Sequence, residues 1–190
     1  MKVHCINIKQ RTQKWIDVQI ECEKLNIEPI RFEAIFKPPG HEGCMLSHVA
    51  VLKSMDEDIF MVIEDDIEVL GTREDIDKAI EQLPDDWDML YLGASLHAPI
   101  ERFSDNLFRL KNAKSTHAVI YNNQNGVVDY IIDNAYAPID VFLAEDVQEK
   151  FNCFITYPLI CTQAEGFSDT VRWFTNYEFI VTNYNKYTNT

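Results

Sequence analysis

The sequence predicts a single α/β domain with a mixed, mainly parallel β-sheet flanked by helices on both faces. Short runs of apolar, β-branched and aromatic residues alternate with segments of helical spacing, which is typical of a βαβ chain. One run, residues 59–63, is apolar throughout, as expected of a strand buried on both faces. The chain of 190 residues, of which 46% are hydrophobic, is long enough to bury one sizeable core.

The first half of the chain predicts three strands joined by two helices. Apolar, β-branched runs predict strands at residues 3–8, 30–35 and 59–63. Apolar residues at helical spacing predict helices at residues 12–25 and 43–55. Because each helix connects two strands, the order predicts parallel pairing through right-handed crossovers.

The second half continues with shorter elements. A helix is expected from Thr72, a suitable N-cap, to Leu83, where Pro84 stops it. The other elements expected here are a helix at residues 127–134 and strands at residues 88–92, 107–110, 116–121 and 154–161. The short spacing between the strands expected at residues 107–110 and 116–121 suits a hairpin.

The domain is expected to occupy residues 1–182. Residues 183–190 are polar and lack hydrophobic periodicity, so we expect this tail to fray. No internal repeat or linker divides the chain before it.

The composition limits the classes of function. With 31 acidic and 17 basic residues, the net charge of −14 disfavours a nucleic-acid acceptor, although an enzyme that extrudes a base needs only a local basic track. No apolar run approaches the length of a membrane span, and the N-terminal stretch does not suit a signal peptide. The five scattered cysteines suit reduced thiols, so we expect a cytoplasmic protein.

Three carboxylates, Glu64, Asp65 and Asp66, directly follow the buried strand at residues 59–63. In open α/β sheets, ligands bind at the carboxyl ends of strands. Along an extended chain Glu64 and Asp66 point one way and Asp65 the other. Two oxygen ligands on one side suit Mg²⁺ or Mn²⁺, with substrate phosphates completing the coordination. A solvated acidic turn is the alternative interpretation.

Polar residues elsewhere also invite a functional interpretation. Asn7 and Arg11 follow the first strand, at the same expected edge of the sheet as Glu64. His48 lies one step from the apolar face of its helix, where a buried structural histidine is favoured over a catalytic one.

Several motifs occur in the order seen in glycosyltransferase family 25, which the chain resembles over nearly its whole length. The motifs are INIKQR (6–11), GCMLSH (43–48), MVIEDDIEV (61–69), WDMLYLG (87–93), THAVIY (116–121), PID (138–140) and YPLICTQAEGFSD (157–169). The pair formed by GC-x-LSH and EDD is the most specific. The family includes lipopolysaccharide glycosyltransferases and proteins similar to collagen galactosyltransferases. The resemblance implies a GT-A-like fold and transfer, with inversion, from a nucleotide diphosphate sugar, with a UDP-sugar expected.

The resemblance also implies roles for single residues. Asp66 would bind the Mn²⁺ or Mg²⁺ that bridges the donor diphosphate, whereas the strand-end pattern described above makes Glu64 the second candidate metal ligand. Glu64 and Asp65 would hold ribose or sugar hydroxyls. The other candidate donor-binding residues are Asn7, Arg11, Ser47 and His48. The family pattern N-L-x-x-R-x-D-R is only half kept, because Gln13 and Lys14 occupy its last two places, and Gly40-His41-Glu42 replaces the usual GEI.

Inversion requires a base that accepts the proton of the acceptor hydroxyl. Asp140, flanked by Ile139 and Val141, matches the aspartate of the family's PID-like segment and is our candidate. Its alternative role is that of an N-cap for the segment that follows. The rival candidates are Glu145, Asp146 and Asp169.

Three classes of function follow from these features. The leading hypothesis is an active, metal-dependent glycosyltransferase. The second is a catalytically silent nucleotide-sugar-binding protein on the same fold, and the third is a divalent-ion or interaction module whose acids are solvated. The acceptor class stays open among glycans, hydroxylated side chains and hydroxymethylated nucleobases.

Overall fold

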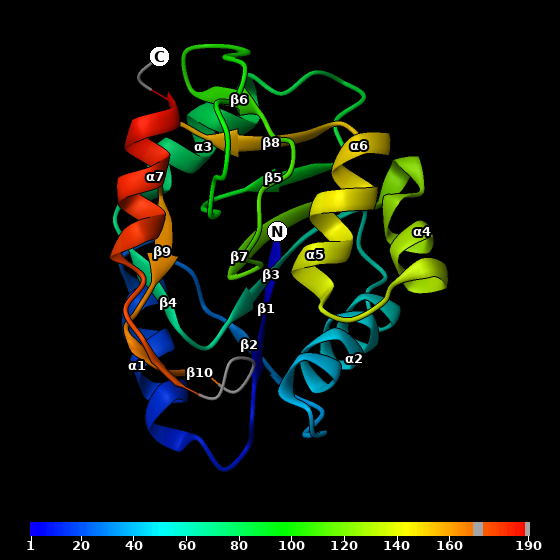
Figure 1. Cartoon of the computed structure of the whole chain (residues 1–190), viewed down its shortest axis with the longest axis vertical. Helices are drawn as coiled ribbons and strands as arrows, with labels where there is room; N and C mark the ends of the chain where they lie inside the picture. The colour runs from blue at the N-terminus through cyan, green and yellow to red at the C-terminus, as the bar shows by residue number, and fades with distance from the viewer. Residues whose placement is uncertain (169–172, 189–190) are drawn as a thin grey trace.

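A computed structural model describes residues 1–168 and 173–188 of the chain. Its centre is a seven-stranded sheet in the order β2-β1-β3-β7-β5-β8-β6 (Figure 1). The parallel strands are β1 (Lys2–Asn7), β2 (Ile30–Glu33), β3 (Ile59–Glu64), β5 (Met89–Tyr91) and β8 (Cys153–Thr156). Two strands, β6 (Leu107–Arg109) and β7 (Ala118–Asn122), run in the opposite direction. The predicted mixed, mainly parallel sheet is confirmed.

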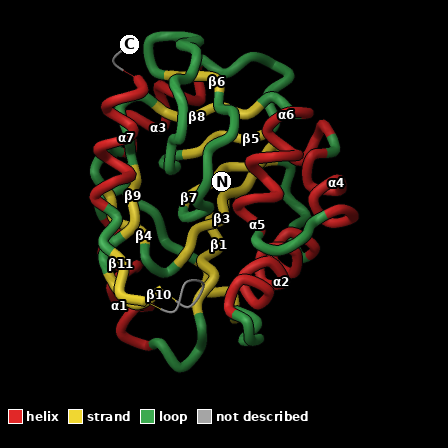
Figure 2. Tube along the Cα trace, viewed as in Figure 1, coloured by secondary structure: helices red, strands yellow, loops and turns green. Residues whose placement is uncertain are grey.

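Helices cover both faces of this sheet (Figure 2). One face carries α1 (Thr12–Glu23) and α3 (Arg73–Glu81). The other carries α2 (Gly40–Lys53), α4 (Val127–Asn134), α5 (Ile139–Phe142) and α7 (Glu178–Thr188). Strand β3 contributes side chains to the core on both faces of the sheet, because successive side chains of a strand point to opposite faces. Phe60 and Val62 pack toward α2 and α4, whereas Met61 and Ile63 pack toward α1 and α3.

Short elements complete the fold. A 3₁₀ turn, Asn123–Asn125, precedes α4, and a π-helical stretch, Leu143–Val147, connects α5 to α6 (Gln148–Lys150). Two small antiparallel sheets pair β4 (Ile67–Val69) with β9 (Cys161–Gln163) and β10 (Gly166–Ser168) with β11 (Trp173–Thr175).

The predicted start of α3 is confirmed. The hydroxyl of Thr72 accepts from the backbone N–H of Asp75 at 3.3 Å, and the Asp75 carboxylate accepts from the backbone N–H of Thr72 at 2.9 Å. This reciprocal pair is a capping box, which satisfies backbone donors that a helix start leaves unpaired.

Two strand predictions were wrong. The segments at residues 107–110 and 116–121 do not form a hairpin, because β6 pairs with β8 while β7 inserts between β3 and β5. The predicted strand at residues 154–161 is two strands in different sheets, β8 and β9. Pro158, which has no N–H to donate to a ladder, lies in the bend between them.

The expected frayed tail differs from the structure. Residues 183–188 belong to α7, and the side chains of Ile180, Tyr184 and Thr188 are buried. The hydroxyl of Tyr184 donates to the carbonyl of Thr156 at 2.5 Å. Tertiary packing therefore orders a segment that has little periodicity of its own, while residues 189 and 190 lie outside the described part. Across residues 1–168 and 173–188, none of the helices has the length and apolar character needed to cross a membrane.

Candidate active site

A cavity of about 620 Å³ lies at the carboxyl ends of the parallel strands. Its walls come from the segments that follow β1, β2, β3 and β5 and from the segment that leads into β7. Because β7 runs against its neighbours, its first residues lie at the edge where β3 and β5 end. The predicted site residues at the cavity wall are Arg11, Ser47, His48, Glu64, Asp65, Asp66 and Asp140.

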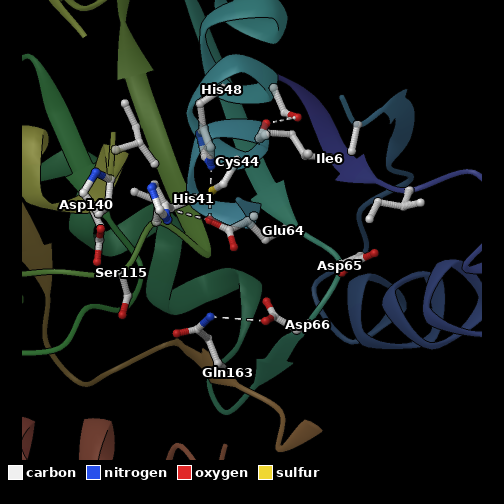
Figure 3. Close-up of a pocket in the computed structure, with 18 of the residues that line it drawn as sticks. Ile6, His41, Cys44, His48, Glu64, Asp65, Asp66, Ser115, Asp140 and Gln163 are labelled. Carbon is white, nitrogen blue, oxygen red and sulfur yellow. Dashed lines mark hydrogen bonds and ion pairs between the residues drawn. The ribbon is translucent and has the colours of Figure 1, made fainter. Parts of the chain in front are cut away.

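Glu64, the last residue of β3, forms hydrogen bonds on the α2 side of the cavity (Figure 3). Its Oε1 lies 3.1 Å from Nε2 of His48 and accepts a short hydrogen bond from the hydroxyl of Thr116. Burial alone would raise the pKa of Glu64, but the hydrogen bonds from His48 and Thr116 outweigh burial and hold this pKa below its usual value. Glu64 is therefore a carboxylate at neutral pH.

Asp66 lies in a different environment although it is two residues away. One carboxylate oxygen, Oδ2, accepts from the side-chain amide of Gln163 on β9 at 3.3 Å (Figure 3). The other, Oδ1, is buried without a hydrogen-bond partner among the described residues. Burial, followed by repulsion from Glu64, raises the pKa of Asp66 to about 7. An unpaired buried carboxylate oxygen is costly, and a cation would relieve that cost.

Asp65 turns toward α1, away from the partners of Glu64 and of Asp66. Its carboxylate accepts from the side-chain amide of Asn7 at 2.5 Å and lies 3.6 Å from Nζ of Lys14. Asn7 is only 1% exposed, and its own oxygen accepts from Nε of Arg31 at 2.8 Å. Burial raises the pKa of Asp65, and the nearby ammonium of Lys14 opposes that effect. Asn7 thus orients Asp65 from behind the cavity wall.

The hydroxyl of Ser47 forms hydrogen bonds that hold two segments of the fold together. Its hydroxyl donates to the carbonyl of Gly43 at 2.7 Å and accepts from the backbone N–H of Ile35 at 2.8 Å. These two bonds tie the segment after β2 to α2. The hydroxyl proton is already in use, so Ser47 could only accept a hydrogen bond from a ligand.

Asp140 lies at the cavity wall, and in Figure 3 it and Asp65 appear on opposite sides of Glu64. The alternative N-cap role was wrong, because Pro138 is the N-cap and α5 begins at Ile139. Asp140 is the second residue of that helix, and its carboxylate accepts from the backbone N–H of Val141 at 2.9 Å.

The rival candidates for the base differ in their surroundings. Asp146 accepts from the hydroxyl of Tyr130 and from Nζ of Lys150, each at 2.6 Å. Neither Asp146 nor Glu145 is among the residues that line the cavity. Asp169 lies outside the described residues.

Sequence reasoning missed part of the cavity wall. The segment at residues 114–116 lines the site, and its Ser115 has φ of 74°, a left-handed conformation that is uncommon outside glycine and frequent at functional sites. Lys114 exchanges two backbone hydrogen bonds with Ser95, whose buried hydroxyl has no partner among the described residues. No local motif marks Ser95, Lys114 or Ser115, because β7 brings them to the site only through long-range pairing.

An apolar rim forms another part of the wall that the sequence did not indicate. It consists of Ile35, Phe36, Tyr177 and Phe179, which come from the segment after β2 and from the start of α7. Phe36 is 74% exposed although it is a large apolar residue. An exposed aromatic beside a cavity offers a surface for stacking a flat ring.

The donor atoms at the acidic end fit a hard divalent cation. Mg²⁺ and Mn²⁺ are commonly bound by one or two carboxylates and substrate phosphates. Asp66 supplies Oδ1, which has no partner in the described part of the chain, and Glu64 supplies an ionised carboxylate nearby. Both residues line a cavity with room for a ligand.

The fold has known counterparts. No protein-family model matches the chain, and no curated protein matches its sequence. The structure is similar to A197 from STIV, with a TM-score of 0.54 and 12% identity over 93% of this chain and 95% of that one. It is also similar to a glycosyltransferase involved in the glycosylation of the major capsid of PBCV-1, with a TM-score of 0.53 and 10% identity over 81% of this chain and 80% of that one.

At such identities these likenesses show the fold alone. The GT-A-like α/β fold is therefore confirmed, and it is a fold that a glycosyltransferase uses. Membership of glycosyltransferase family 25 stays a prediction.

Proposed function

We propose that this protein is a metal-dependent glycosyltransferase that moves a sugar, with inversion, from a UDP-sugar to an acceptor hydroxyl. One observation carries the proposal: the Oδ1 atom of Asp66, at the wall of a cavity of about 620 Å³, is buried without a hydrogen-bond partner among the described residues. This aspartate follows a central strand at the edge of the sheet where α/β folds bind ligands. The fold shared with a glycosyltransferase supports the same interpretation.

Asp66 would hold Mn²⁺ or Mg²⁺, with the carboxylate of Glu64 beside it. When bound, the cation supplies Lewis-acid stabilisation of the charge that develops on the leaving diphosphate. His48 and Thr116 keep Glu64 ionised and fixed in direction through their hydrogen bonds.

Cationic and apolar residues at the wall suit the other parts of the donor. Arg11 and Lys114 line the cavity and can form charge-assisted hydrogen bonds with phosphate oxygens. Asp65, oriented by Asn7, can accept hydrogen bonds from hydroxyl groups of the ribose or the sugar. The apolar rim, and Phe36 in particular, can stack on the nucleobase.

Asp140 is the proposed base. It lies at the cavity wall, whereas the rival Asp146 is held by Tyr130 and Lys150. As the bond from the acceptor oxygen to the anomeric carbon forms, Asp140 would take the hydroxyl proton while the diphosphate leaves with the bonding electrons. The acceptor class remains open among glycans, hydroxylated side chains and hydroxymethylated nucleobases.

The experiment is a thermal-shift screen of nucleotide diphosphate sugars with Mn²⁺ and, in parallel, with EDTA. A specific donor stabilises the native state by mass action, by about 2.7 kcal/mol at one hundred times Kd. We expect a rise in Tm with a UDP-sugar and Mn²⁺ and little rise in EDTA. Glu68→Gln, which changes an exposed acid just beyond the cluster, is the control variant and should show the same rise in Tm as the wild type. A chain that no nucleotide sugar stabilises would refute the proposal.

Donor turnover separates the enzyme from the catalytically silent binder. The same donor, incubated with Mn²⁺, should be hydrolysed slowly or transferred, with release of the nucleoside diphosphate. Binding without release under any condition would favour the silent nucleotide-sugar-binding protein.

A further inference from the structure

Cys44, His48 and Glu64 form a cluster whose thiol has no part in the proposed transfer. The Sγ of Cys44, a ring nitrogen of His48 and a carboxylate oxygen of Glu64 all lie within 4.8 Å of one another. In Figure 3 the sulfur of Cys44 and the ring of His48 both point toward Glu64. The cluster opens on the cavity, because all three residues line it.

The fold explains why these three side chains meet. Cys44 and His48 are four residues apart on α2, so both lie on the same face of the helix. That helix packs on β3, and Glu64 is the last residue of this strand. The same spacing of two ligands on one helical face occurs in the metal-binding H-E-x-x-H motif.

The donor atoms favour a particular class of cation. A thiolate, an imidazole and a carboxylate are the ligands of Zn²⁺, whereas Mg²⁺ and Mn²⁺ prefer oxygen. Bonds of about 2.0–2.3 Å place the ligand atoms of a tetrahedral zinc roughly 3–4 Å apart. A cluster already within 4.8 Å requires only small side-chain rotations to reach that spacing.

We propose that Cys44, His48 and Glu64 form a binding site for Zn²⁺ or a similar thiophilic divalent cation, which would share Glu64 with the oxygen site at Asp66. Three protein ligands leave the fourth position open toward the cavity, as in zinc sites that exchange a ligand. Thr116 would keep Glu64 oriented through its hydrogen bond. Binding displaces the proton of the Cys44 thiol, which passes to solvent, and the proton of His48 Nε2 moves to Nδ1 as Nε2 becomes a ligand.

The surroundings of His48 set the expected strength of binding. Tight zinc sites give the second ring nitrogen of each histidine a hydrogen-bond partner. Nδ1 of His48 is buried and has none among residues 1–168 and 173–188. We therefore expect reversible binding rather than a permanent structural zinc.

Zinc at this site would inhibit transfer. The ion would engage the Glu64 carboxylate and stand inside the donor cavity, so Zn²⁺ should oppose the reaction that Mn²⁺ supports. This consequence rests on the proposed function, whereas the binding itself does not.

Cobalt(II) tests the binding directly, because a cobalt–thiolate bond gives a charge-transfer band in the near ultraviolet. The full chain titrated with Co²⁺ should show this band together with tetrahedral ligand-field bands, and Zn²⁺ should displace both. Cys44→Ser should remove the charge-transfer band. Cys22→Ser is the matched control, since Cys22 is a free thiol buried in the opposite layer and should leave the band intact.

Two further variants keep the test decisive. His48→Gln should weaken cobalt binding at least tenfold, and Cys44→Ala should behave like Cys44→Ser, with melting curves showing that each variant folds. Absence of the band in the wild-type chain, or a band that survives loss of Cys44, would overturn the site. If the band forms as expected but no nucleotide sugar binds, the zinc site stands and the proposed function fails.

Discussion

Three neighbouring acids show how far the surroundings of a residue decide its chemistry. Hydrogen bonds from His48 and Thr116 hold the pKa of Glu64 low, although burial works in the other direction. Burial raises the pKa of Asp65 and raises that of Asp66 to about 7. The three residues are adjacent in sequence, yet each side chain forms hydrogen bonds with different partners.

Asp66→Asn should alter both stability and donor binding. Folding raises the pKa of Asp66 from 3.8 to about 7, so its contribution to stability is present below pH 3.8 and is lost as the pH rises to 7. Without divalent cations, Asp66→Asn should therefore melt above the wild type at pH 8, and this advantage should vanish near pH 4. The variant should also lose Mn²⁺-dependent donor binding.

Melting curves at the two pH values, with and without Mn²⁺, check the change at Asp66. Mn²⁺ should raise the Tm of the wild type at pH 8 and leave that of Asp66→Asn unchanged. Donor binding that persists in the variant, or in EDTA, would contradict the assignment of Asp66 as the metal ligand.

Asp140→Asn should separate catalysis from binding. A variant without its base keeps its Tm and its affinity for donor and Mn²⁺, but transfer falls by roughly 10²–10⁴-fold. Asp146→Asn is the matched control, because its partners Tyr130 and Lys150 tie Asp146 to stability rather than to the cavity. Transfer near the wild-type rate in Asp140→Asn would move the role of base to another carboxylate.

At the scale of elements, one close approach joins the central sheet to the small β4–β9 sheet. The carbonyl of Leu92, the residue after β5, accepts from the backbone N–H groups of Ile160 and Cys161 at 3.0 and 2.9 Å. Gly93 follows, and a Cβ there would lie 1.9 Å from the carbonyl oxygen of Cys161 and 2.5 Å from Nε2 of His117. Only a residue without a side chain fits between these two segments.

Gly93→Ala should strongly destabilise the fold. Overpacking a core commonly costs about 1–3 kcal/mol, and the clash with a backbone carbonyl places this change at the upper end or beyond. Gly166→Ala is the control, since a Cβ at Gly166 meets nothing within 4 Å. Urea unfolding measures the free energy of unfolding of both variants. Equal values would show that the backbone after β5 can shift enough to accommodate a Cβ at residue 93.

At the scale of the whole molecule, a buried histidine links stability to pH on the acid side. His117 enters β7 from the cavity edge, and its Nε2 lies 3.3 Å from the carbonyl oxygen of Cys161. Burial lowers the pKa of His117 to about 4, so the folded protein holds it neutral. Asp66 acts in the opposite direction, because its ionisation becomes costly as the pH rises to 7.

His117→Gln should flatten the acid side of the stability curve. The pKa of His117 is lowered from 6.5 to about 4, so its contribution is present above pH 6.5 and is lost as the pH falls toward 4. Gln retains an amide that can donate to Cys161. The Tm difference between pH 7.5 and pH 4.5 should therefore be smaller in the variant, and an unchanged difference would show that other groups govern acid unfolding.

Local patterns determined much of this protein from the sequence alone. The βαβ order, the strand at residues 59–63 and the capped helix after Thr72 depend on neighbours within a few residues, and all are observed. That the acids after β3 would meet polar residues from β1 was predictable for the same reason, since strand ends in α/β sheets meet at one edge. Asn7, Asp65 and Glu64 do meet there.

Only the tertiary structure decided the long-range pairings. The insertion of β7 between β3 and β5, the separation of β8 from β9 and the docking of α7 each join residues far apart in the chain. The same pairings bring Thr116 to Glu64 and Gln163 to Asp66, and among the described residues they leave Oδ1 of Asp66 buried without a partner. Periodicity records which face of an element is buried but not which element covers it, so these contacts could be known only once the sheet was assembled.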